Sequence, residues 1–408
     1  MDQHVTCCIA GGGPAGMMLG VLLARAGVDV LVLEKHKDFL RDFRGDTIHP
    51  STLRLMEELG WLDEFLRLPH QEVKQLYGQF GETRIKLADF SSLPISTKFI
   101  ALMPQWDFLD FLAEKGRAYP KFSLRMNAEA TDLVHDGGRV SGVKVTTPEG
   151  PLTVSADLVV AADGRTSTLR KASGLVSENF GAPMDVMWFR LPRLPTDTEE
   201  TQARFDAGQI FIMLQRGDYW QCAYVIPKGD DAKVRAAGLD AFRKSVGALL
   251  PFEASRADAI ADWDHVKLLT VAVDRLNEWA RPGLLCIGDA AHAMSPVGGV
   301  GINLAVQDAV AAANSLWQPL KEKRLTFDDL KTVQARRDFP THATQRLQLT
   351  VQNRVIAKTL AKTRDVKPPL AFRLFNSLPF LSRIPARLIG LGFRPEHVSD
   401  AIRKGNGA

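Results

Sequence analysis

Short apolar runs separated by glycine mark the start of the chain. Residues 4–10 are mostly apolar and end at a glycine cluster, which predicts a buried strand. Small and apolar residues with a helical pattern follow to about Ala26, and a second apolar run covers 28–34. The order strand, helix, strand predicts the opening of an α/β fold with a parallel sheet.

The middle of the chain alternates helical and strand-rich stretches. Helical periodicity covers 51–66, with Ser51 as the N-cap, and 106–119. Apolar runs between turns predict a hairpin excursion attached to the main sheet, with strands at 122–126, 128–135, 139–147 and 152–162. Residues 181–273 are β-rich and aromatic, with one helix near 235–250, and they indicate an inserted second domain.

The last part of the chain is helical and basic. A strand at 283–287 leads through a glycine-rich loop into a helix at 302–318. Further helical patterns cover 326–362, 368–377, 384–391 and 395–404. Residues 340–408 hold 12 Lys and Arg against 3 Asp and Glu, so this region differs electrostatically from the rest of the chain.

Composition narrows the class of protein. With 408 residues, 45% of them hydrophobic and 24% charged, the chain is neither a disulfide-stapled peptide nor a disordered one. The net charge of +4 is too small to suggest a nucleic-acid partner. The four cysteines form no C-x-x-C pair and have no histidine with ligand spacing, so we expect a reducing compartment and no metal. The start is unlike a signal peptide and the apolar runs fall short of the ~20 residues of a membrane span, which favours a cytoplasmic location.

Residues 11–16, GGGPAG, fit the dinucleotide-binding fingerprint G-x-G-x-x-G. In this pattern Gly11 allows a tight turn, Gly13 lets a pyrophosphate approach the backbone, and Gly16 lets the helix pack on the strand. Glu34 ends the second strand about 20 residues further on, where a carboxylate can bind ribose hydroxyls. These features in this order predict a dinucleotide site.

Two later motifs indicate which dinucleotide is bound. Residues 158–165 read LVVAADGR, a strand that ends in Asp163-Gly164-Arg165, and residues 283–303 read GLLCIGDAAHAMSPVGGVGIN. Together with the glycine turn, and in this order, they resemble the para-hydroxybenzoate-hydroxylase-like (class A) family of FAD-dependent aromatic monooxygenases.

The resemblance implies a set of cofactor contacts. Asp289 would hold the ribityl chain of FAD, while Asp163 and Gly164 would lie near the pyrophosphate. Arg44 and Gln105 match family positions that contact FAD. The loop that begins at Pro296 would run along the flavin ring and present a helix N-terminus to it. The expected cofactor-binding set is Gly11, Gly13, Pro14, Ala15, Gly16, Glu34, Lys35, Arg44, Gln105, Asp163, Gly164, Asp289, Pro296, Gly299, Gly301, Ile302 and Asn303.

The resemblance also implies the reaction. NADPH or NADH would reduce bound FAD, O2 would add to give a flavin C4a-hydroperoxide, and one oxygen would go to an electron-rich ring, so no protein nucleophile is required. A second G-x-G-x-x-G motif is missing, which fits transient docking of the nicotinamide cofactor. His49, Tyr224 and Pro296 are weak candidates for a direct role, and a covalent flavin bond through His49 stays open. His292 is expected to be structural.

Aromatic residues of the insertion are candidates for the substrate pocket. One face of the strands would meet the flavin, and the other would meet a helix layer or solvent. Arg190 could bind an anionic group, although a solvated arginine is favoured. The expected substrate-binding set is Trp188, Arg190, Phe211, Met213, Trp220, Tyr224 and Met294.

Other flavoprotein classes leave different signatures. Flavin halogenases carry W-x-W-x-I-P, whereas residues 222–227 read CAYVIP here. A geranylgeranyl-reductase-like enzyme, acting on an isoprenoid or quinone-like substrate, is the main alternative, and a non-catalytic flavin module is a third class. The leading hypothesis is hydroxylation of an aromatic, phenol-like small molecule by a monomer or homodimer.

We expect a Rossmann-like FAD-binding domain built from residues 1–75, 101–180 and 274–340. A β-sheet substrate domain would comprise 76–100 and 181–273, and 341–408 would form a helical, basic C-terminal region. That region would either pack on the body or touch an anionic membrane surface, and packing is favoured. The chain ends before the thioredoxin-like domain of larger family members, so we expect a compact two-domain enzyme.

Overall fold

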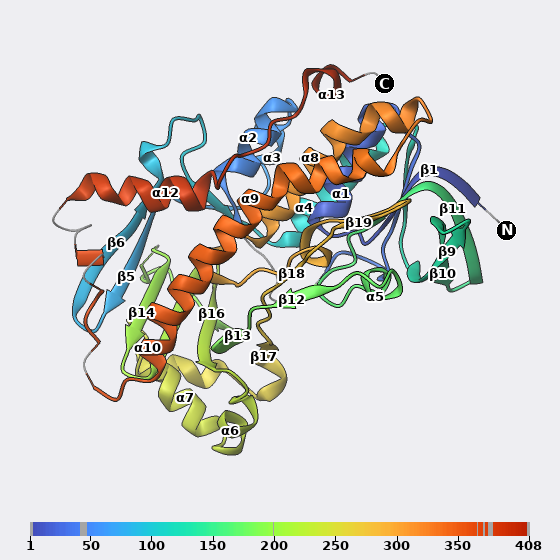
Figure 1. The fold of residues 1–408 in the computed structure, drawn as a ribbon. Helices are drawn as coiled ribbons and strands as arrows, with labels where there is room; N and C mark the ends of the chain where they lie inside the picture. The colour runs from blue at the N-terminus through green and yellow to red at the C-terminus, as the bar shows by residue number, and fades with distance from the viewer. Residues whose placement is uncertain are drawn as a thin grey trace.

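Two β-sheets dominate the computed structural model, which describes residues 3–40, 47–198, 200–364, 366–369, 372–373 and 378–405. The first sheet lies at the right of Figure 1 with helices against it, and the second lies at the lower left. The long helix α9 (Phe327–Val351) runs between the two regions. The α/β fold with a β-rich insertion is confirmed.

The first sheet is Rossmann-like, with the strand order β19-β20-β11-β1-β2-β8. The pairings that link β20, β11, β1, β2 and β8 are all parallel, and every residue of β2 is buried. The strands are β1 (Gln3–Ala10), β2 (Val30–Leu33), β8 (Phe122–Arg125), β11 (Gly150–Ala161), β19 (Ala280–Arg281) and β20 (Leu284–Cys286). Its main helices are α1 (Pro14–Arg25), α4 (Gln105–Arg117) and α8 (Gly301–Lys321), and α1 packs against both α4 and α8.

A hairpin excursion extends the first sheet, as the sequence predicts. Strands β9 (Glu129–Asp136) and β10 (Arg139–Thr147) pair antiparallel, and β10 pairs with the first half of β11. The second half of β11 pairs with β1 and β20 instead, so one long strand serves both parts of the sheet.

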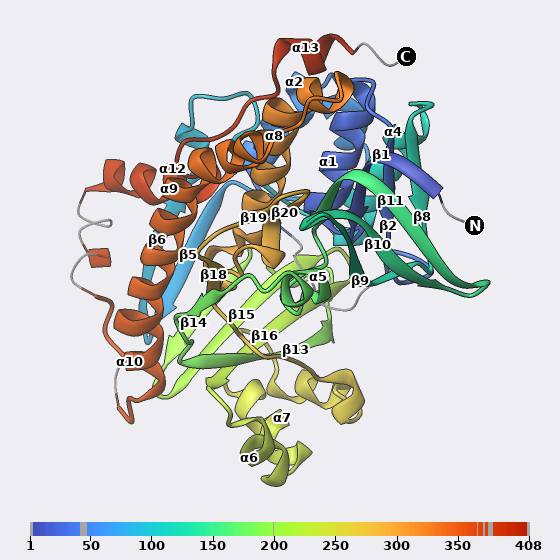
Figure 2. The ribbon, with the colours of Figure 1, turned by 45° about the vertical axis from the view of Figure 1, so that its right-hand side comes forward.

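The second sheet has seven strands in the order β17-β13-β16-β15-β14-β5-β6. Residues 76–100 contribute two of these strands, and the others come from the insertion. The strands are β5 (Gln75–Phe80), β6 (Thr83–Asp89), β13 (Met184–Pro192), β14 (Gln202–Asp206), β15 (Gln209–Arg216), β16 (Tyr219–Pro227) and β17 (Lys267–Leu269). Helices α6 (Asp231–Ala236) and α7 (Leu239–Gly247) lie beneath this sheet in Figure 2. The single helix expected near 235–250 is therefore two, separated at Gly238, whose φ of +93° breaks the helical backbone.

Shorter elements connect the two sheets. The strands β3 (Thr47–Ile48), β4 (Gln71–Val73) and β7 (Ile100–Leu102) form a small sheet, and β12 (Ser177–Asn179) pairs with β18 (Asp274–Leu276). The helix expected at 51–66 is two helices, α2 (Pro50–Glu58) and α3 (Leu62–Phe65), and Gly60 between them has a φ of +74°. The N-cap of α2 is His49 rather than Ser51, because Pro50 occupies the first helical position.

The C-terminal region is not separated from the residues before it by a loop. The boundary expected between 340 and 341 falls inside helix α9, which includes Pro340. A π-helical turn (Gln352–Ile356) and α10 (Ala357–Leu360) follow, then α12 (Arg383–Gly390) and α13 (Asp400–Lys404). Most of the helix expected at 368–377 lies outside the described residues, and the one expected at 395–404 begins only at Asp400.

Helix α13 packs against α1. The Arg25 side chain, in the last turn of α1, donates hydrogen bonds to the carbonyl oxygens of Ile402 and Arg403 at 2.9 and 2.6 Å. Helix α12 buries Ala386 and Gly390, while Phe380 and Ile384 are exposed. Among the helices of the described ranges, none is long and apolar enough to cross a membrane.

Candidate active site

The three sequence motifs and Glu34 meet at one edge of the first sheet. The glycine turn follows β1, Glu34 follows β2, Asp163 follows β11, and Asp289 follows β20. These strands are parallel neighbours, so their carboxyl ends lie at the same edge. In open α/β sheets, this edge is where ligands bind.

The glycine turn has room for a pyrophosphate at one position only. An added Cβ at Gly11 would lie 2.3 Å from the Ala162 carbonyl oxygen, and one at Gly16 would lie 2.0 Å from the Gly11 carbonyl oxygen. A Cβ at Gly13 would meet no atom within 4 Å. Gly13 is also the N-cap of α1, which has Pro14 in its first turn and neither a side-chain cap nor an acidic residue there. Free backbone N–H groups therefore face open space, which fits an anionic cofactor group.

Glu34 is buried beside this turn. Its carboxylate accepts hydrogen bonds from the backbone N–H groups of Gly12 at 3.0 Å and His36 at 3.1 Å. The carboxylate thus fixes the turn, and a carboxylate at this position can also accept hydrogen bonds from ribose hydroxyls. The neighbouring Lys35 is exposed.

Asp163 lies on the turn after β11, and Asp289 lies on the turn after β20. The Asp163 carboxylate accepts hydrogen bonds from the backbone N–H groups of Thr168 at 2.8 Å and Leu169 at 3.2 Å, at the start of α5 (Thr168–Ala172). Asp163 therefore shapes its turn, and a Cβ at Gly164 would meet open space. Arg165 donates from Nε to the Asp289 carboxylate at 3.0 Å, which links the two motifs.

The loop that begins at Pro296 is held by residues from a distant part of the chain. Gly298 and Gly299 have φ values of +79° and +63°, which glycine adopts readily. The Thr47 hydroxyl donates to the Gly299 carbonyl oxygen at 2.8 Å. Beyond the loop, the N-terminus of α8 at Gly301 has no side-chain cap and no acidic residue. Ile302, in this first turn, is buried.

Asn303 ties the start of α8 to the segment 47–52. Its Oδ1 accepts hydrogen bonds from the His49 backbone N–H at 2.9 Å and the Thr52 hydroxyl at 2.7 Å, and its Nδ2 donates to the Thr47 carbonyl oxygen at 3.2 Å. All of these contacts are within the protein, so Asn303 positions the loop.

His49 is fully buried rather than solvated. Its Nδ1 lies 2.8 Å from the Ile389 carbonyl oxygen, which can only accept, so Nδ1 carries the proton. Burial lowers the pKa of His49 to about 4, and the ring is therefore neutral near pH 7. Its Nε2 has no hydrogen-bond partner within the part of the chain that the structure describes.

Arg44 and Gln105 are the two other residues expected to contact the cofactor. Arg44 lies outside the described residues. Gln105 is the first residue of α4, directly after Pro104, and is half-buried.

The strands of the second sheet divide the expected substrate-binding residues between two faces. Trp188 belongs to an apolar cluster that includes Val297 of the loop, and Arg190 shares its face by strand alternation. Phe211, Met213, Trp220 and Tyr224 belong instead to the cluster around Phe242 of α7. Those four residues face away from the loop, so the structure does not bring them to it. Met294 is buried in the segment leading into the loop.

Contacts on the α7 face account for the polar atoms of these residues. Trp220 donates from Nε1 to Asp197 at 3.0 Å, and the Tyr224 hydroxyl accepts from Gln209 at 3.2 Å. Burial raises the pKa of Tyr224. The contacts of Tyr224 are therefore structural, and its side chain does not reach the loop.

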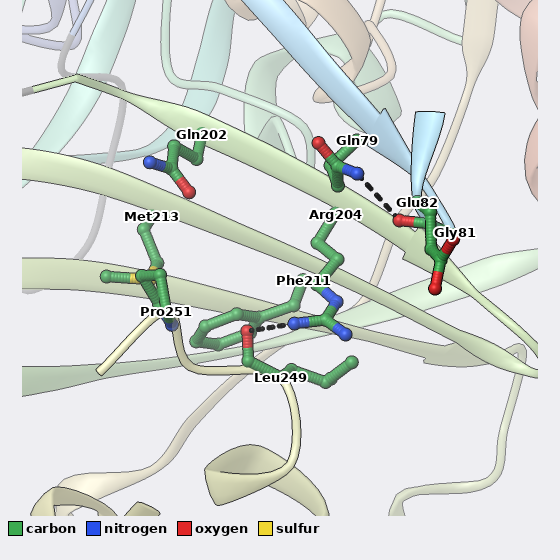
Figure 3. A pocket seen from close by; sticks show the side chains of 9 residues that line it. All are labelled: Gln79, Gly81, Glu82, Gln202, Arg204, Phe211, Met213, Leu249 and Pro251. Carbon is green, nitrogen blue, oxygen red and sulfur yellow. Dashed lines mark hydrogen bonds between the residues drawn. The ribbon is translucent and has the colours of Figure 1, made fainter. Parts of the chain in front are cut away.

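A cavity of about 330 Å³ also opens on this far face, between the edge of the sheet and the segment after α7. Figure 3 shows Phe211 and Met213 beside it, with Arg204 donating to the Leu249 carbonyl oxygen at 3.4 Å. The sheet separates this cavity from the loop, so it does not belong to the candidate active site.

A buried ion network beneath the third motif was not foreseen from the sequence. Asp308 of α8 accepts hydrogen bonds from Arg337 of α9 at 2.9 Å and from the Gly288 backbone N–H at 3.1 Å, and lies 2.6 Å from His292. Burial alone would favour the neutral acid, but His292 and Arg337 hold the pKa of Asp308 below its ordinary value. The members of this network come from α8, α9 and the segment 288–292, and no sequence spacing reveals them. The structural role expected for His292 agrees with this geometry.

Comparisons with known proteins show the family of this chain. A protein-family model described as FAD binding domain matches residues 4–346. The chain is 33% identical over 386 residues to 6-methylpretetramide 4-monooxygenase of Streptomyces rimosus, a match that covers 94% of this chain and 90% of that protein. It is 24% identical over 328 residues to para-nitrophenol 4-monooxygenase of a Pseudomonas species, with 77% and 78% coverage.

The solved structures show the same fold. p-Nitrophenol 4-monooxygenase PnpA from Pseudomonas putida superposes with a TM-score of 0.76 at 22% identity, covering 95% of this chain and 97% of that one. The matched family model spans most of the chain and includes all three motifs. The chain therefore belongs to the FAD binding domain family, and it is an FAD-dependent aromatic monooxygenase of the para-hydroxybenzoate-hydroxylase-like class.

Proposed function

We propose that this monooxygenase hydroxylates a planar, phenol-like aromatic compound held between the Pro296 loop and the second sheet. The observation that carries the proposal is that the expected FAD site lies beside the apolar face of the second sheet. The motifs that would hold FAD meet at one sheet edge, and the loop beside them packs through Val297 onto the apolar face of the second sheet. A ring bound on this face would lie next to the flavin.

The FAD contacts follow from the fit of the edge to the cofactor. Open space at Gly13 and the uncapped start of α1 would take the pyrophosphate. Glu34 would bind ribose hydroxyls, and Asp289 would bind a ribityl hydroxyl while Arg165 holds its carboxylate in place. Gly164, which leaves open space, would border the pyrophosphate.

The protein's contribution to the reaction would be electrostatic and steric. Bound FAD, once reduced by NADPH or NADH, supplies the activation of O2 and the transfer of one oxygen atom. The uncapped N-terminus of α8 would stabilise negative charge on the reduced flavin ring. The apolar sheet face, with Val186, Ala223 and Ile212, would exclude water from the ring.

Two relatives support an aromatic substrate. One is named for 6-methylpretetramide and the other for para-nitrophenol, which is a phenol. Phe211, Met213, Trp220 and Tyr224 are not part of the proposed pocket because they face α7. Trp188 and Met294 stay in it, with Arg190 near its rim.

The test is oxygenation by purified protein. A yellow protein should consume NADPH or NADH in air faster when a suitable phenol is added, and the product should gain one oxygen atom by mass. Reduction of an isoprenoid or quinone in the absence of O2, with no oxygenation of any phenol, would instead support the reductase alternative.

A further inference from the structure

The inner face of α9 carries a row of glutamines that bind the backbone leading into the Pro296 loop. Gln345 donates from Nε2 to the carbonyl oxygens of Asp274 at 2.8 Å and Ala293 at 3.2 Å. Gln348 donates to the carbonyl oxygens of Ser295 at 2.9 Å and Val297 at 2.8 Å, and its Oε1 accepts from the Ser295 backbone N–H at 3.2 Å. Each of these amides is used by the protein itself.

Gln352, the next glutamine of the row, has no such partner. It begins the π-helical turn after α9 and is completely buried, yet neither its Oε1 nor its Nε2 makes a hydrogen bond to any of the residues that the structure describes. A buried amide that makes no hydrogen bond destabilises the folded state, so native proteins rarely keep one without use. Single π-helical turns inside α-helices are also frequent at functional sites.

Neighbours of Gln352 place it at the proposed substrate pocket. Gln348, four residues before it, binds the Val297 carbonyl oxygen. Ile356, four residues after it, belongs to the apolar cluster that contains Val297, Trp188 and Ala223. Residues four apart lie on one helix face, so Gln352 stands between the loop and the sheet. The Trp188 Nε1, in the same cluster, is also buried, and it has no hydrogen-bond partner among the described residues.

We propose that Gln352 is a substrate-binding residue that recognises oxygen groups on the edge of the aromatic ring, together with Trp188. This inference rests on the proposed function. The amide offers an NH2 donor group and a carbonyl acceptor, so a ring with a hydroxyl group beside a carbonyl group can pair with both: the hydroxyl exchanges its internal hydrogen bond to the carbonyl for one to Oε1, and the carbonyl accepts from Nε2. The indole N–H of Trp188 offers a further donor to either oxygen. Both sets of atoms are shielded from solvent, so the proposal requires the surrounding side chains to move aside when the substrate enters.

The experiment titrates the FAD-loaded enzyme with 1-hydroxy-2-acetonaphthone, which has the hydroxyl beside the carbonyl, and with 2-acetonaphthone, which lacks the hydroxyl. Binding is followed by the change in flavin absorbance. The test variant is Gln352→Met, which keeps the size of the side chain and removes the amide. The matched control is Asn353→Ala, which removes an exposed amide at the next position.

The wild type should bind the hydroxylated ring at least ten-fold more tightly than the other. Gln352→Met should abolish this preference, with unchanged FAD content and an equal or higher Tm, because it removes an unsatisfied buried group. Asn353→Ala should keep the preference.

Four results would overturn the assignment. Equal binding of the two rings by the wild type would show that no such edge recognition exists. If Gln352→Met keeps the preference, Gln352 is not the residue that recognises the ring. If Gln352→Met loses both the preference and FAD, the amide acts at the cofactor site and not at the substrate. If the wild type oxygenates no aromatic compound at all, the proposed function fails and this inference fails with it.

Discussion

Arg165 donates a hydrogen bond from Nε to the Asp289 carboxylate at 3.0 Å, although the two residues are far apart in the sequence. Both side chains are about one-third exposed, at 35% and 32%. An exposed ion pair contributes little to stability, so the value of this one lies in holding the carboxylate in one orientation. Arg165 of the second motif thereby orients the carboxylate of Asp289 in the third motif.

Replacing Asp289 should weaken FAD binding. A hydrogen bond to a charged group is worth about 1.5–3 kcal/mol, so Asp289→Ala should lower the affinity for FAD by about 10- to 100-fold. Arg165→Ala should have a smaller effect, because it acts only through Asp289. Titration of the apoprotein with FAD measures both effects, with Lys144→Ala, in an exposed ion pair of the hairpin, as the control. Wild-type affinity in Asp289→Ala would refute the ribityl placement.

Substitutions of two glycines of the first motif should affect different properties, which are FAD retention for Gly13 and stability of the apoprotein for Gly16. Gly13→Ala adds a methyl group where the protein has no atom within 4 Å, so the apoprotein should keep its Tm while FAD retention falls. Gly16→Ala places a methyl group 2.0 Å from the Gly11 carbonyl oxygen and should destabilise the apoprotein by about 1–3 kcal/mol. Thermal unfolding of both apoproteins, with FAD content measured separately, distinguishes them. Full FAD retention in Gly13→Ala would mean that the cofactor lies elsewhere.

Two tryptophans on opposite faces of the second sheet should separate substrate binding from stability. Trp220→Phe breaks the hydrogen bond to Asp197 in a buried cluster and should cost about 1–2 kcal/mol of unfolding free energy with KM unchanged. Trp188→Phe removes an N–H that has no protein partner, so it should leave stability unchanged and raise KM for the aromatic substrate. Urea unfolding and steady-state kinetics on the two variants test the assignment of faces, and the opposite pattern would reverse it.

Stability should fall in mild acid because of His49. Its pKa is about 4 in the folded protein and about 6.5 when unfolded, so between these values only the unfolded chain takes up the proton. The unfolded state then binds more protons, and stability declines as the pH falls from about 6.5 to about 4, where the loss levels off. At pH 4.5 the loss from this group should be about 2–3 kcal/mol.

The check is urea unfolding at pH 7 and pH 4.5, at one fixed FAD concentration. His49→Gln should reduce the difference between the two pH values, while His135→Gln, at an exposed position in β9, should keep the wild-type difference. An unchanged difference in His49→Gln would show that His49 is protonated in the folded state.

The sequence by itself determined the cofactor edge, because each of its motifs is a local feature. A strand, a glycine turn and a helix occupy consecutive residues, and parallel pairing of β1, β2, β11 and β20 places Gly13, Glu34, Asp163 and Asp289 at the same edge. The family and the reaction class follow from these motifs. The hairpin excursion and the β-rich insertion were also predictable, since turns and alternation are local.

Only the tertiary structure decided which side chains face the loop. Alternation along β13, β15 and β16 defines two faces, but long-range packing of α7 on one face and of the Pro296 loop on the other decides which face is which. For this reason Tyr224 and Trp188 look equivalent in the sequence and lie on opposite faces. The same holds for Gln352, because helical periodicity puts it on a buried stripe, whereas its lack of a partner depends on how α9 crosses between the two sheets.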